Sequence, residues 1–255
     1  MRKESDNRTP STVFEGMTSI RAVLSAPKTN DRKIIRILFD GTKKEARRKD
    51  LSYLSAISEK NGFDIIETDR ETIERITTGN THGGIIAECT GRTIPSLDET
   101  APVKNGFYVM PDGIEDPYNF GYAVRSIWAA GADGIVLPER NWMSAAGVVC
   151  RSSAGASEML GMLGTADPAG ACRFFKDYGY KVVCAGIRDS VSMYDADLRK
   201  PVFLVIGGEK RGIARSVLEE ADVTVRIDYG RPFRGSLSTA SAAAVLSYEI
   251  LRQNR

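Results

Sequence analysis

The chain has 255 residues, of which 42% are hydrophobic and 27% charged, and its net charge is +2. This composition is that of a globular protein, so neither a disordered chain nor a strongly basic overall surface is expected. No run approaches 18 consecutive apolar residues, and the polar N-terminal stretch has no apolar segment behind it, so neither a membrane span nor a secretory signal is predicted. The length fits two small domains.

Cysteine and histidine are too sparse to suggest a metal site. The four cysteines form no C-x-x-C pair, and His82 is the single histidine, so neither a zinc site nor a disulfide framework is predicted. Reduced cysteines favour a cytoplasmic location. His82 itself is expected to be a turn residue rather than a catalyst.

The first part of the chain is predicted to be a small α/β unit over residues 13–90, because strand-like and helix-like segments alternate. Residues 1–12 are polar and are expected to be flexible. The predicted elements are strands at 34–39, 63–68 and 84–89, a helix at 45–62 that ends at Gly62, and a short helix at 70–76.

Residues 91–104 are polar, contain two prolines and are predicted to be a linker. The alternation that follows predicts a mostly parallel sheet covered by helices over residues 105–255. The predicted strands are 106–110, 134–138, 181–186, 202–207 and 223–228, and the predicted helices lie near 119–130, 142–158, 168–178, 212–220 and 238–252.

Three stretches carry candidate chemistry, and the first is 116-DPYNFGYAVRS-126. Asn119 is expected to cap the helix that follows the Asp-Pro turn. Arg125 is expected to be buried among small and apolar residues, where a guanidinium must be paired or must face a cleft. The alternatives are an Arg that reaches solvent or one that pairs with a structural carboxylate.

In the second stretch, the apolar strand 202–207 ends in Gly207-Gly208-Glu209. In the third, the basic loop 229–235 leads through Ser236-Leu237-Ser238 into the last helix. Ligands of open parallel sheets bind at the carboxyl ends of strands. Taken singly, the second stretch also fits a turn with a capping Glu, and the third also fits a helix that docks on the sheet. No dinucleotide or phosphate-loop fingerprint is present, which disfavours a nucleotide-dependent oxidoreductase.

Taken together, the motifs DPxNxGxxxR, GGExxGI and SLS, with 151-RSSAGASE-158, resemble the SpoU-type (TrmH-like) RNA ribose 2′-O-methyltransferases of the trefoil-knot SPOUT superfamily. The resemblance implies a C-terminal trefoil-knotted methyltransferase domain and a homodimer. It also implies a small N-terminal α/β, ribosomal-protein-like RNA-binding domain, on the basis of 14-FEGMTSIRAVL-24 and 81-THGGIIAEC-89.

The resemblance also implies the roles of individual residues. S-adenosylmethionine would be held by Gly207, Gly208, Ile227, Leu237 and Ser238, and the catalytic residues would be Arg125, Asn119, Glu209 and Ser236. Because a guanidinium keeps its proton, we expect Arg125 to bind a phosphate and orient the hydroxyl rather than act as the base. Gly208 and Ser238 stand where the family commonly has Asn. This departure leaves an alternative, a dimer that binds RNA without methylating it.

Basic residues gather between residues 28 and 49, where nine Lys and Arg stand against three acidic residues. Such a cluster attracts phosphate, although a solvated helix face would have the same composition. The two-domain layout favours ribosomal over transfer RNA, and an antibiotic-resistance role is compatible with the family. The residues predicted to contact RNA are Lys43, Lys44, Arg47, Arg48, Arg231 and Arg234.

Overall fold

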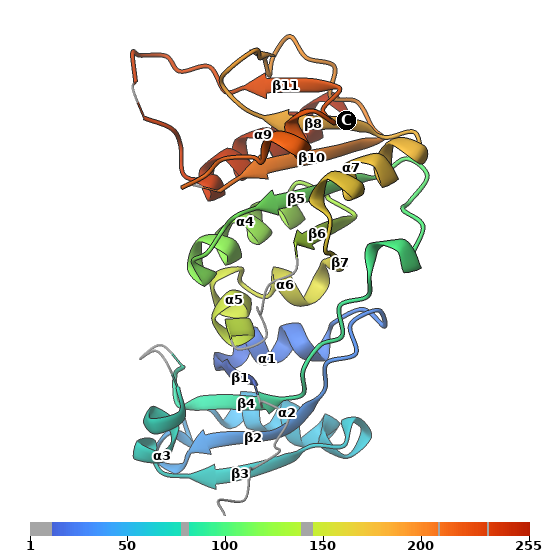
Figure 1. Cartoon of the computed structure of the whole chain (residues 1–255). Coiled ribbons are helices and arrows are strands. Elements are labelled where there is room, and N and C mark those ends of the chain that lie inside the picture. Colours follow the sequence, from blue (N-terminus) through green and yellow to red (C-terminus); the bar gives the residue numbers. More distant parts are fainter. Residues whose placement is uncertain (1–11, 78–81, 139–144, 209, 234) are drawn as a thin grey trace, which may run out of the picture. The chain divides into compact units, whose positions relative to one another are not determined.

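The computed structural model describes residues 12–77, 82–138, 145–208, 210–233 and 235–255. It contains two compact units: Met1–Thr93 with Asn141–Met159 (unit 1), and Ile94–Arg140 with Leu160–Arg255 (unit 2) (Figure 1). The chain passes between the units at residue 93, within the segment predicted as a linker, whereas 145–159, placed after the linker by sequence, groups with unit 1. None of the described helices has both the length and the apolar character needed to cross a bilayer.

Unit 1 is a four-stranded mixed sheet with strand order β1-β4-β2-β3. Strand β4 is antiparallel to β1 and β2, while β2 and β3 are parallel. The strands are β1 (Thr12–Glu15), β2 (Ile34–Asp40), β3 (Asp64–Thr68) and β4 (Ile85–Cys89). The helices are α1 (Gly16–Leu24), α2 (Arg48–Asn61), α3 (Arg70–Ile76), α5 (Ala146–Ser152) and α6 (Ala156–Met159), with the 3-10 turn η1 (Gly41–Lys43).

The ends of α2 and α3 follow from local sequence. Gly62 adopts the left-handed conformation, with φ of 70°, and ends α2 as predicted. Asp69 caps α3, because its carboxylate accepts a hydrogen bond of 2.7 Å from the amide of Thr72. The sequence prediction missed β1 and α1.

Buried contacts explain why residues 145–159 belong to unit 1. Cys150 of α5 packs in the same core as Phe14 of β1. Nε of Arg32 donates to a carboxylate oxygen of Glu158 at 2.9 Å, and both side chains are 3% exposed. The guanidinium of Arg32 also lies 4.8 Å from the centre of the Phe14 ring. Arg32 therefore belongs to the interior, so the count of nine basic residues overstated the exposed charge of this region.

Unit 2 contains seven strands in the order β7-β6-β5-β10-β8-β11-β9, and every strand pair described is parallel, which confirms the predicted sheet. The short strands β7 and β9 were not predicted. The strands are β5 (Phe107–Asp112), β6 (Gly134–Pro138), β7 (Gly161–Thr165), β8 (Lys181–Ala185), β9 (Val191–Ser192), β10 (Val202–Gly207) and β11 (Val223–Arg226). The helices are α4 (Pro117–Ala129), α7 (Pro168–Asp177), α8 (Arg215–Leu218) and α9 (Thr239–Gln253), with the 3-10 turn η2 (Leu97–Glu99).

Helices cover both faces of this sheet, as expected for buried parallel strands. Phe203 of β10 packs with Phe175 of α7 and Val217 of α8. Leu204, the next residue, is also buried and points to the opposite face, where α9 contacts β10 and packs along α4 (Figure 1). Because the strands are parallel, the loops that follow β5, β8, β10 and β11 emerge at one edge of the sheet, where ligands bind in such folds.

Candidate functional site

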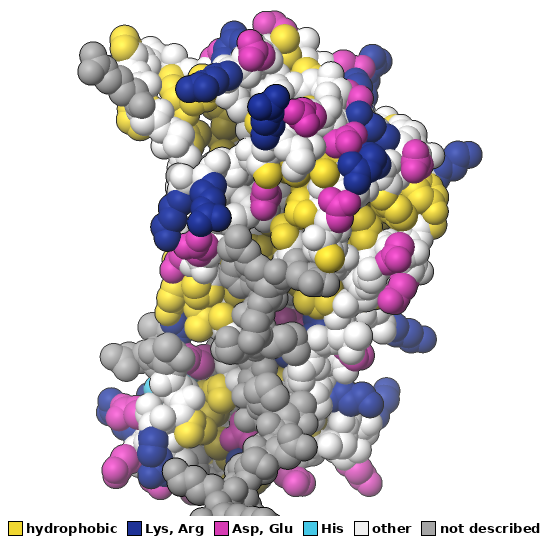
Figure 2. Space-filling view, in the orientation of Figure 1, with side chains coloured by type: hydrophobic (Ala, Val, Ile, Leu, Met, Phe, Trp, Pro, Cys, Tyr) yellow, Lys and Arg dark blue, Asp and Glu magenta, His cyan; other side chains and the backbone are white. Residues whose placement is uncertain are grey.

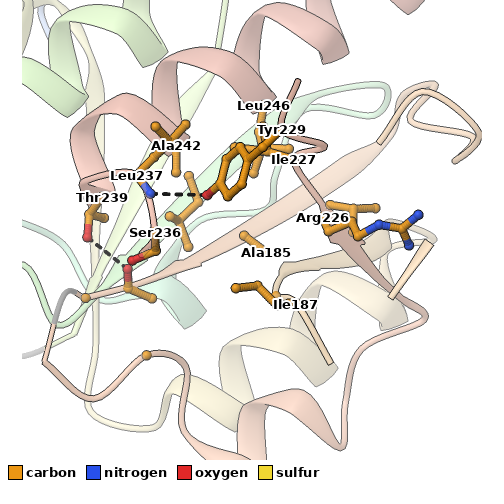
Figure 3. Close-up of a pocket in the computed structure, with 16 residues that line it drawn as sticks. Ala185, Ile187, Arg226, Ile227, Tyr229, Ser236, Leu237, Thr239, Ala242 and Leu246 are labelled. Atoms are coloured by element: carbon orange, nitrogen blue, oxygen red, sulfur yellow. Dashed lines mark hydrogen bonds between the residues drawn. The ribbon is translucent and has the colours of Figure 1, made fainter. Parts of the chain in front are cut away.

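The loops after β8, β10 and β11 surround a cavity of about 270 Å³ together with the first turns of α9 (Figure 3). Its walls are mainly apolar side chains and glycine backbone, a surface suited to a flat, partly apolar ligand. The lining residues are Ala185, Gly186, Ile187, Ile206, Gly207, Gly208, Gly212, Val225, Arg226, Ile227, Tyr229, Ser236, Leu237, Thr239, Ala242 and Leu246.

Close backbone contacts require both glycines at the end of β10. A Cβ on Gly207 would lie 2.5 Å from the carbonyl carbon of Gly212, and a Cβ on Gly208 would overlap the carbonyl of Gly113. The loop is closed by the amide of Gly212, which donates to the carbonyl of Gly208 at 3.0 Å. The Gly-Gly sequence therefore shapes this wall, because any side chain would force the loops apart.

Two hydrogen bonds fix the loop between β11 and α9 (Figure 3). The amide of Leu237 donates to the hydroxyl of Tyr229 at 3.2 Å, and the hydroxyl of Thr239 donates to the carbonyl of Gly207 at 3.0 Å. Ser238 caps α9, because its hydroxyl accepts a hydrogen bond of 3.2 Å from the amide of Ser241. The two motif segments are therefore tied to each other at the start of α9.

A second cavity of about 150 Å³ adjoins the first. Thr239 lines both cavities, while Gly113 lines the smaller one and contacts Gly208 of the larger one. On the smaller cavity, Nζ of Lys210 pairs with Glu115 at 2.6 Å and so links the loop after β10 to the loop after β5. The residues lining this cavity are Gly113, Ile114, Glu115, Asp116, Asn119, Lys210 and Thr239.

The prediction that Asn119 caps α4 is wrong. Asp116 is the N-cap, and its carboxylate accepts a hydrogen bond of 2.8 Å from the amide of Asn119. Pro117 takes the first helical position, where its missing N–H costs nothing. With the cap supplied by Asp116, Asn119 contributes to the wall of the smaller cavity.

The prediction that Arg125 is buried is also wrong. The side chain is exposed on α4, and it lines neither of the two cavities. Tyr118 and Tyr122, also exposed, precede it at the i, i+4, i+7 spacing of one helix face. The buried residues of α4, which include Phe120, Val124 and Ile127, pack toward the interior, and this orientation leaves Arg125 outside.

The charged groups at the rim of the larger cavity neutralise each other. Nε of Arg226 pairs with Asp228 at 2.9 Å, and its guanidinium also donates to the carbonyl of Ser190 at 2.6 Å. The pKa of Asp228 lies below its usual value because the hydroxyl of Ser192 donates to it and Arg226 stands beside it. Arg226 points away from the other labelled residues, so it contributes little positive charge to the cavity (Figure 3).

The basic cluster of unit 1 is partly neutralised. Lys44 pairs with Glu67 at 2.7 Å, and Arg47 pairs with Asp50 at 3.0 Å and donates to the carbonyl of Gly83. Figure 2 shows Lys and Arg side chains interspersed with Asp and Glu on the visible face. In the described part of the chain, Lys43 and Arg48 are exposed without an ion pair. The charge available to a phosphate is therefore smaller than the sequence count suggests.

The larger cavity brings together most of the residues predicted to bind the cofactor. Gly207, Gly208, Ile227, Leu237 and the predicted catalytic Ser236 line it, whereas Ser238 is the helix cap and is not among the lining residues. Glu209 and Arg234 lie outside the described residues, and Arg231 is exposed. His82 is a turn residue, as predicted, because its Nδ1 accepts a hydrogen bond of 3.1 Å from the amide of Gly84.

Sequence reasoning missed several residues of both cavities. The loop Ala185–Ile187 could have been found, because it follows a predicted strand of the parallel sheet and contains Gly186. Thr239 immediately follows the SLS motif. Tyr229 and Lys210 had no signal, since their positions depend on how the loops fold back over the strand ends.

Comparison with protein families gives two matches that together cover most of the chain. The model described as "SpoU rRNA Methylase family" matches residues 106–248, and the one described as "RNA 2′-O ribose methyltransferase substrate binding" matches residues 15–95.

Several curated proteins are similar in sequence. The "Putative TrmH family tRNA/rRNA methyltransferase YacO" of Bacillus subtilis is 30% identical over 77% of this chain and 80% of its own length. The "23S rRNA (guanosine-2′-O-)-methyltransferase RlmB" of Shewanella oneidensis is 29% identical over 92% and 96%. An "Uncharacterized tRNA/rRNA methyltransferase" of Mycobacterium ulcerans is 30% identical over 76% of this chain, which spans only 64% of that relative's length.

Solved structures share the fold. A crystal structure of an RNA 2′-O ribose methyltransferase gives a TM-score of 0.79 at 23% identity, with 96% of this chain and 89% of that chain covered. The SpoU methyltransferase AviRb of Streptomyces viridochromogenes, in complex with the cofactor AdoMet, gives 0.78 at 21% identity, with 100% and 96% covered. The predicted fold class is confirmed by this likeness, while the trefoil knot stays a prediction that the resemblance carries.

Proposed function

The chain belongs to the SpoU rRNA methylase family, and from this premise we propose that it transfers a methyl group from S-adenosylmethionine to a ribose 2′-hydroxyl of RNA. The observation that carries this proposal is the larger cavity. Both motif segments contribute to its walls, at the carboxyl ends of parallel strands: Gly207, Gly208 and Gly212 from one, and Ile227, Ser236 and Leu237 from the other.

The residues of the larger cavity fit this cofactor. Apolar walls from Ile206, Ile227 and Leu246 suit the faces of an adenine ring, and the glycines present backbone rather than side chains to its polar edges. When bound, S-adenosylmethionine supplies an electrophilic methyl group on a sulfonium sulfur. The contribution of the chain is then to hold that methyl group and the attacking hydroxyl in line, which accounts for much of the rate.

The smaller cavity is the natural place for the target ribose. It adjoins the larger cavity across the contact between Gly113 and Gly208, so ligands in the two cavities would approach each other closely. Asn119 lines this cavity, and Lys210 offers a cation for a neighbouring phosphate once it leaves Glu115.

Because Arg125 is exposed and lines neither cavity, we place its action at the site of a second protomer. It follows Asn119 by six residues, which places it about 9 Å along the axis of α4 and roughly a third of a turn away. In a homodimer joined through the outer face of α4, the guanidinium of one protomer would bind a phosphate at the site of its partner. It would orient the 2′-hydroxyl there, while a phosphate oxygen or water takes the proton.

Exposed aromatic residues support this dimer. Tyr118 and Tyr122 lie on the same face of α4 as Arg125, and Trp128 of α4 and Tyr248 of α9 are also exposed. Aromatic residues and Arg are enriched in protein interfaces. A homodimer that buries this face would remove the aromatic side chains from water and assemble two shared sites.

Ribosomal RNA is the favoured substrate. The relative named for 23S rRNA aligns with 92% of this chain and 96% of its own length, so the alignment includes unit 1 as well as unit 2. Lys43 and Arg48 of unit 1 and Arg231 of unit 2 are exposed cations that can contact phosphates.

The proposal is tested by calorimetric titration with S-adenosylhomocysteine, followed by methyl transfer to ribosomal RNA from cells that lack the protein. We expect micromolar binding and a new 2′-O-methyl group. Arg125→Ala should keep this affinity and lose transfer by about 100-fold or more, since it removes phosphate binding at the reacting centre. Arg173→Ala, which changes an exposed arginine of α7, is the matched control.

One result would contradict the enzyme assignment, and another would contradict the role given to Arg125. A folded protein that binds RNA but neither S-adenosylmethionine nor S-adenosylhomocysteine would be the RNA-binding dimer without methyl transfer that the changed Gly208 and Ser238 leave open. If Arg125→Lys retained full transfer, the bidentate geometry of the guanidinium would be unnecessary and the role given to Arg125 would be wrong.

A further inference from the structure

The loop between β11 and α9 displays an aromatic pair beside the larger cavity. Tyr229 lines the cavity, and its ring centroid lies 5.4 Å from that of Phe233, with the rings at 76°. Phe233 is 57% exposed. The loop extends away from the sheet of unit 2, and hydrophobic side chains are visible on it at the upper left of the space-filling view (Figures 1 and 2).

The exposed ring is held in position rather than left free. Tyr229 packs against it in a T-shaped arrangement, and Tyr229 is itself fixed by the hydrogen bond from the amide of Leu237. Phe233 also lies against Gly235, where an added Cβ would lie 2.7 Å from Cζ of the ring. A fixed, exposed phenylalanine forgoes the free energy of burial, which suggests that another molecule covers it.

The same short loop also carries positive charge. Arg231 is exposed two residues before Phe233, and no ion pair of its guanidinium occurs within the residues that the structure describes. Arg226, on the neighbouring strand, is by contrast neutralised by Asp228. An exposed aromatic ring and an unneutralised cation in one short loop match a nucleotide, which presents a flat base and a phosphate.

We propose that Phe233 is a stacking platform for an unpaired base of the substrate RNA and that Arg231 binds the phosphate of that nucleotide. This inference rests on the proposed function, because it places the base next to the nucleotide whose ribose enters the site. Every base has a flat face, so the platform contributes affinity and position without reading the sequence.

The test measures binding of a fluorescently labelled short oligouridylate and of an abasic oligonucleotide of equal length and charge, both with S-adenosylhomocysteine present. The variants are Phe233→Ala, Phe233→Trp and the control Tyr178→Ala. Tyr178 is a comparably exposed aromatic residue, but it precedes β8 and so lies at the end of that strand opposite the cavity.

We expect Phe233→Ala to weaken oligouridylate binding by roughly 5- to 150-fold, down to the affinity of the abasic probe. Binding of the abasic probe and of S-adenosylhomocysteine should not change, and Phe233→Trp should match the parent protein. The inference is overturned if Phe233→Ala weakens binding of both oligonucleotides equally, weakens binding of S-adenosylhomocysteine, or changes the association of the protomers instead. If Phe233→Ala methylates RNA as well as the parent protein, this inference alone is refuted. If the parent protein binds neither S-adenosylmethionine nor S-adenosylhomocysteine, the proposed function is refuted.

Discussion

Gly208 shows how one residue controls the geometry between the two cavities. The family commonly has Asn here, but in this chain the backbones of Gly113 and Gly208 are in contact. Glycine at position 208, in place of the common Asn, therefore fits the rest of the fold. The loop after β5 occupies the space that a side chain at this position would need. Restoring Asn would require that loop to move.

Gly208→Ala tests this contact. The added methyl group overlaps the carbonyl of Gly113, so we expect the free energy of unfolding to fall by about 1–3 kcal/mol. Affinity for S-adenosylhomocysteine should fall as well, because Gly208 lines the larger cavity. Thermal denaturation and calorimetric titration measure the two effects.

Gly230→Ala is the control in the neighbouring loop, because a Cβ there meets no atom within 4 Å. It should leave both quantities nearly unchanged. If Gly208→Ala also left them unchanged, the backbone contact would not restrict the cavity.

At the scale of elements, α9 is anchored at both ends, and its side chains form part of the cavity wall. Ser238 caps its start and Thr239 ties it to β10. Because Ser and Asn are both good N-caps, the change from the family's Asn preserves this end of the helix. At the other end, Oε1 of Gln253 accepts a hydrogen bond of 2.8 Å from the amide of Leu198.

Glu249 joins the C-terminal anchor of α9. It accepts hydrogen bonds from Arg252 at 2.7 and 2.8 Å and from Gln253 at 2.8 Å, and the Arg252 bonds are the main reason that its pKa lies below the ordinary 4.5. A lowered pKa stabilises the folded state above the unfolded pKa, and this contribution is lost as pH falls through the folded value.

Glu249→Gln should therefore lower the free energy of unfolding by about 1 kcal/mol at neutral pH. Because Arg252 is exposed, the range for exposed ion pairs applies, and this value lies near the top of that range. The difference should vanish in acid, once Glu249 is protonated. Urea denaturation across this pH range measures it. Glu219→Gln, in the exposed pair with Arg215, should have a smaller effect. A difference that persisted unchanged in acid would show that the charge of Glu249 is not responsible.

Most elements were predictable because their signals are local. Gly62 ends α2 through its own backbone conformation, and the apolar run 202–207 gave β10 its correct bounds. The two-residue strand β9 is too short to carry a periodic pattern. Arg32 misled the charge count because its partner, Glu158, is 126 residues away, and such a pairing becomes visible only when the chain has folded.

Some residues of the candidate site were predictable from the sequence, and others were not. The glycines and Leu237 carry their motifs in the sequence, so the larger cavity was anticipated. Tyr229, Lys210 and the position of Arg125 were not, since these depend on how loops close and on which face of α4 packs inward. A sequence motif therefore predicts which residues belong to the site, but not whether their side chains come together within one chain.

At the scale of the whole molecule, the role proposed for the exposed Arg125 places it at the site of a second copy of the chain. The parent protein should then have about twice the 27.9 kDa mass of one chain in light-scattering measurements. Tyr122→Glu places a charge on the proposed interface, so we expect folded monomers that still bind S-adenosylhomocysteine but no longer transfer a methyl group.

Tyr178→Glu changes a comparably exposed aromatic residue that does not lie on α4 or α9, and it should remain dimeric and active. Mixing Arg125→Ala with Tyr229→Ala separates the two models of the site. We expect Tyr229→Ala to be inactive alone, because Tyr229 lines the larger cavity and accepts the hydrogen bond from the amide of Leu237. If Arg125 of each protomer acts at the site of its partner, a mixed dimer contains one complete site. That site has the intact cavity of the Arg125→Ala chain and the Arg125 of the Tyr229→Ala chain, so part of the activity should return. If Arg125 serves its own chain, every site in the mixture keeps one defect and activity stays absent.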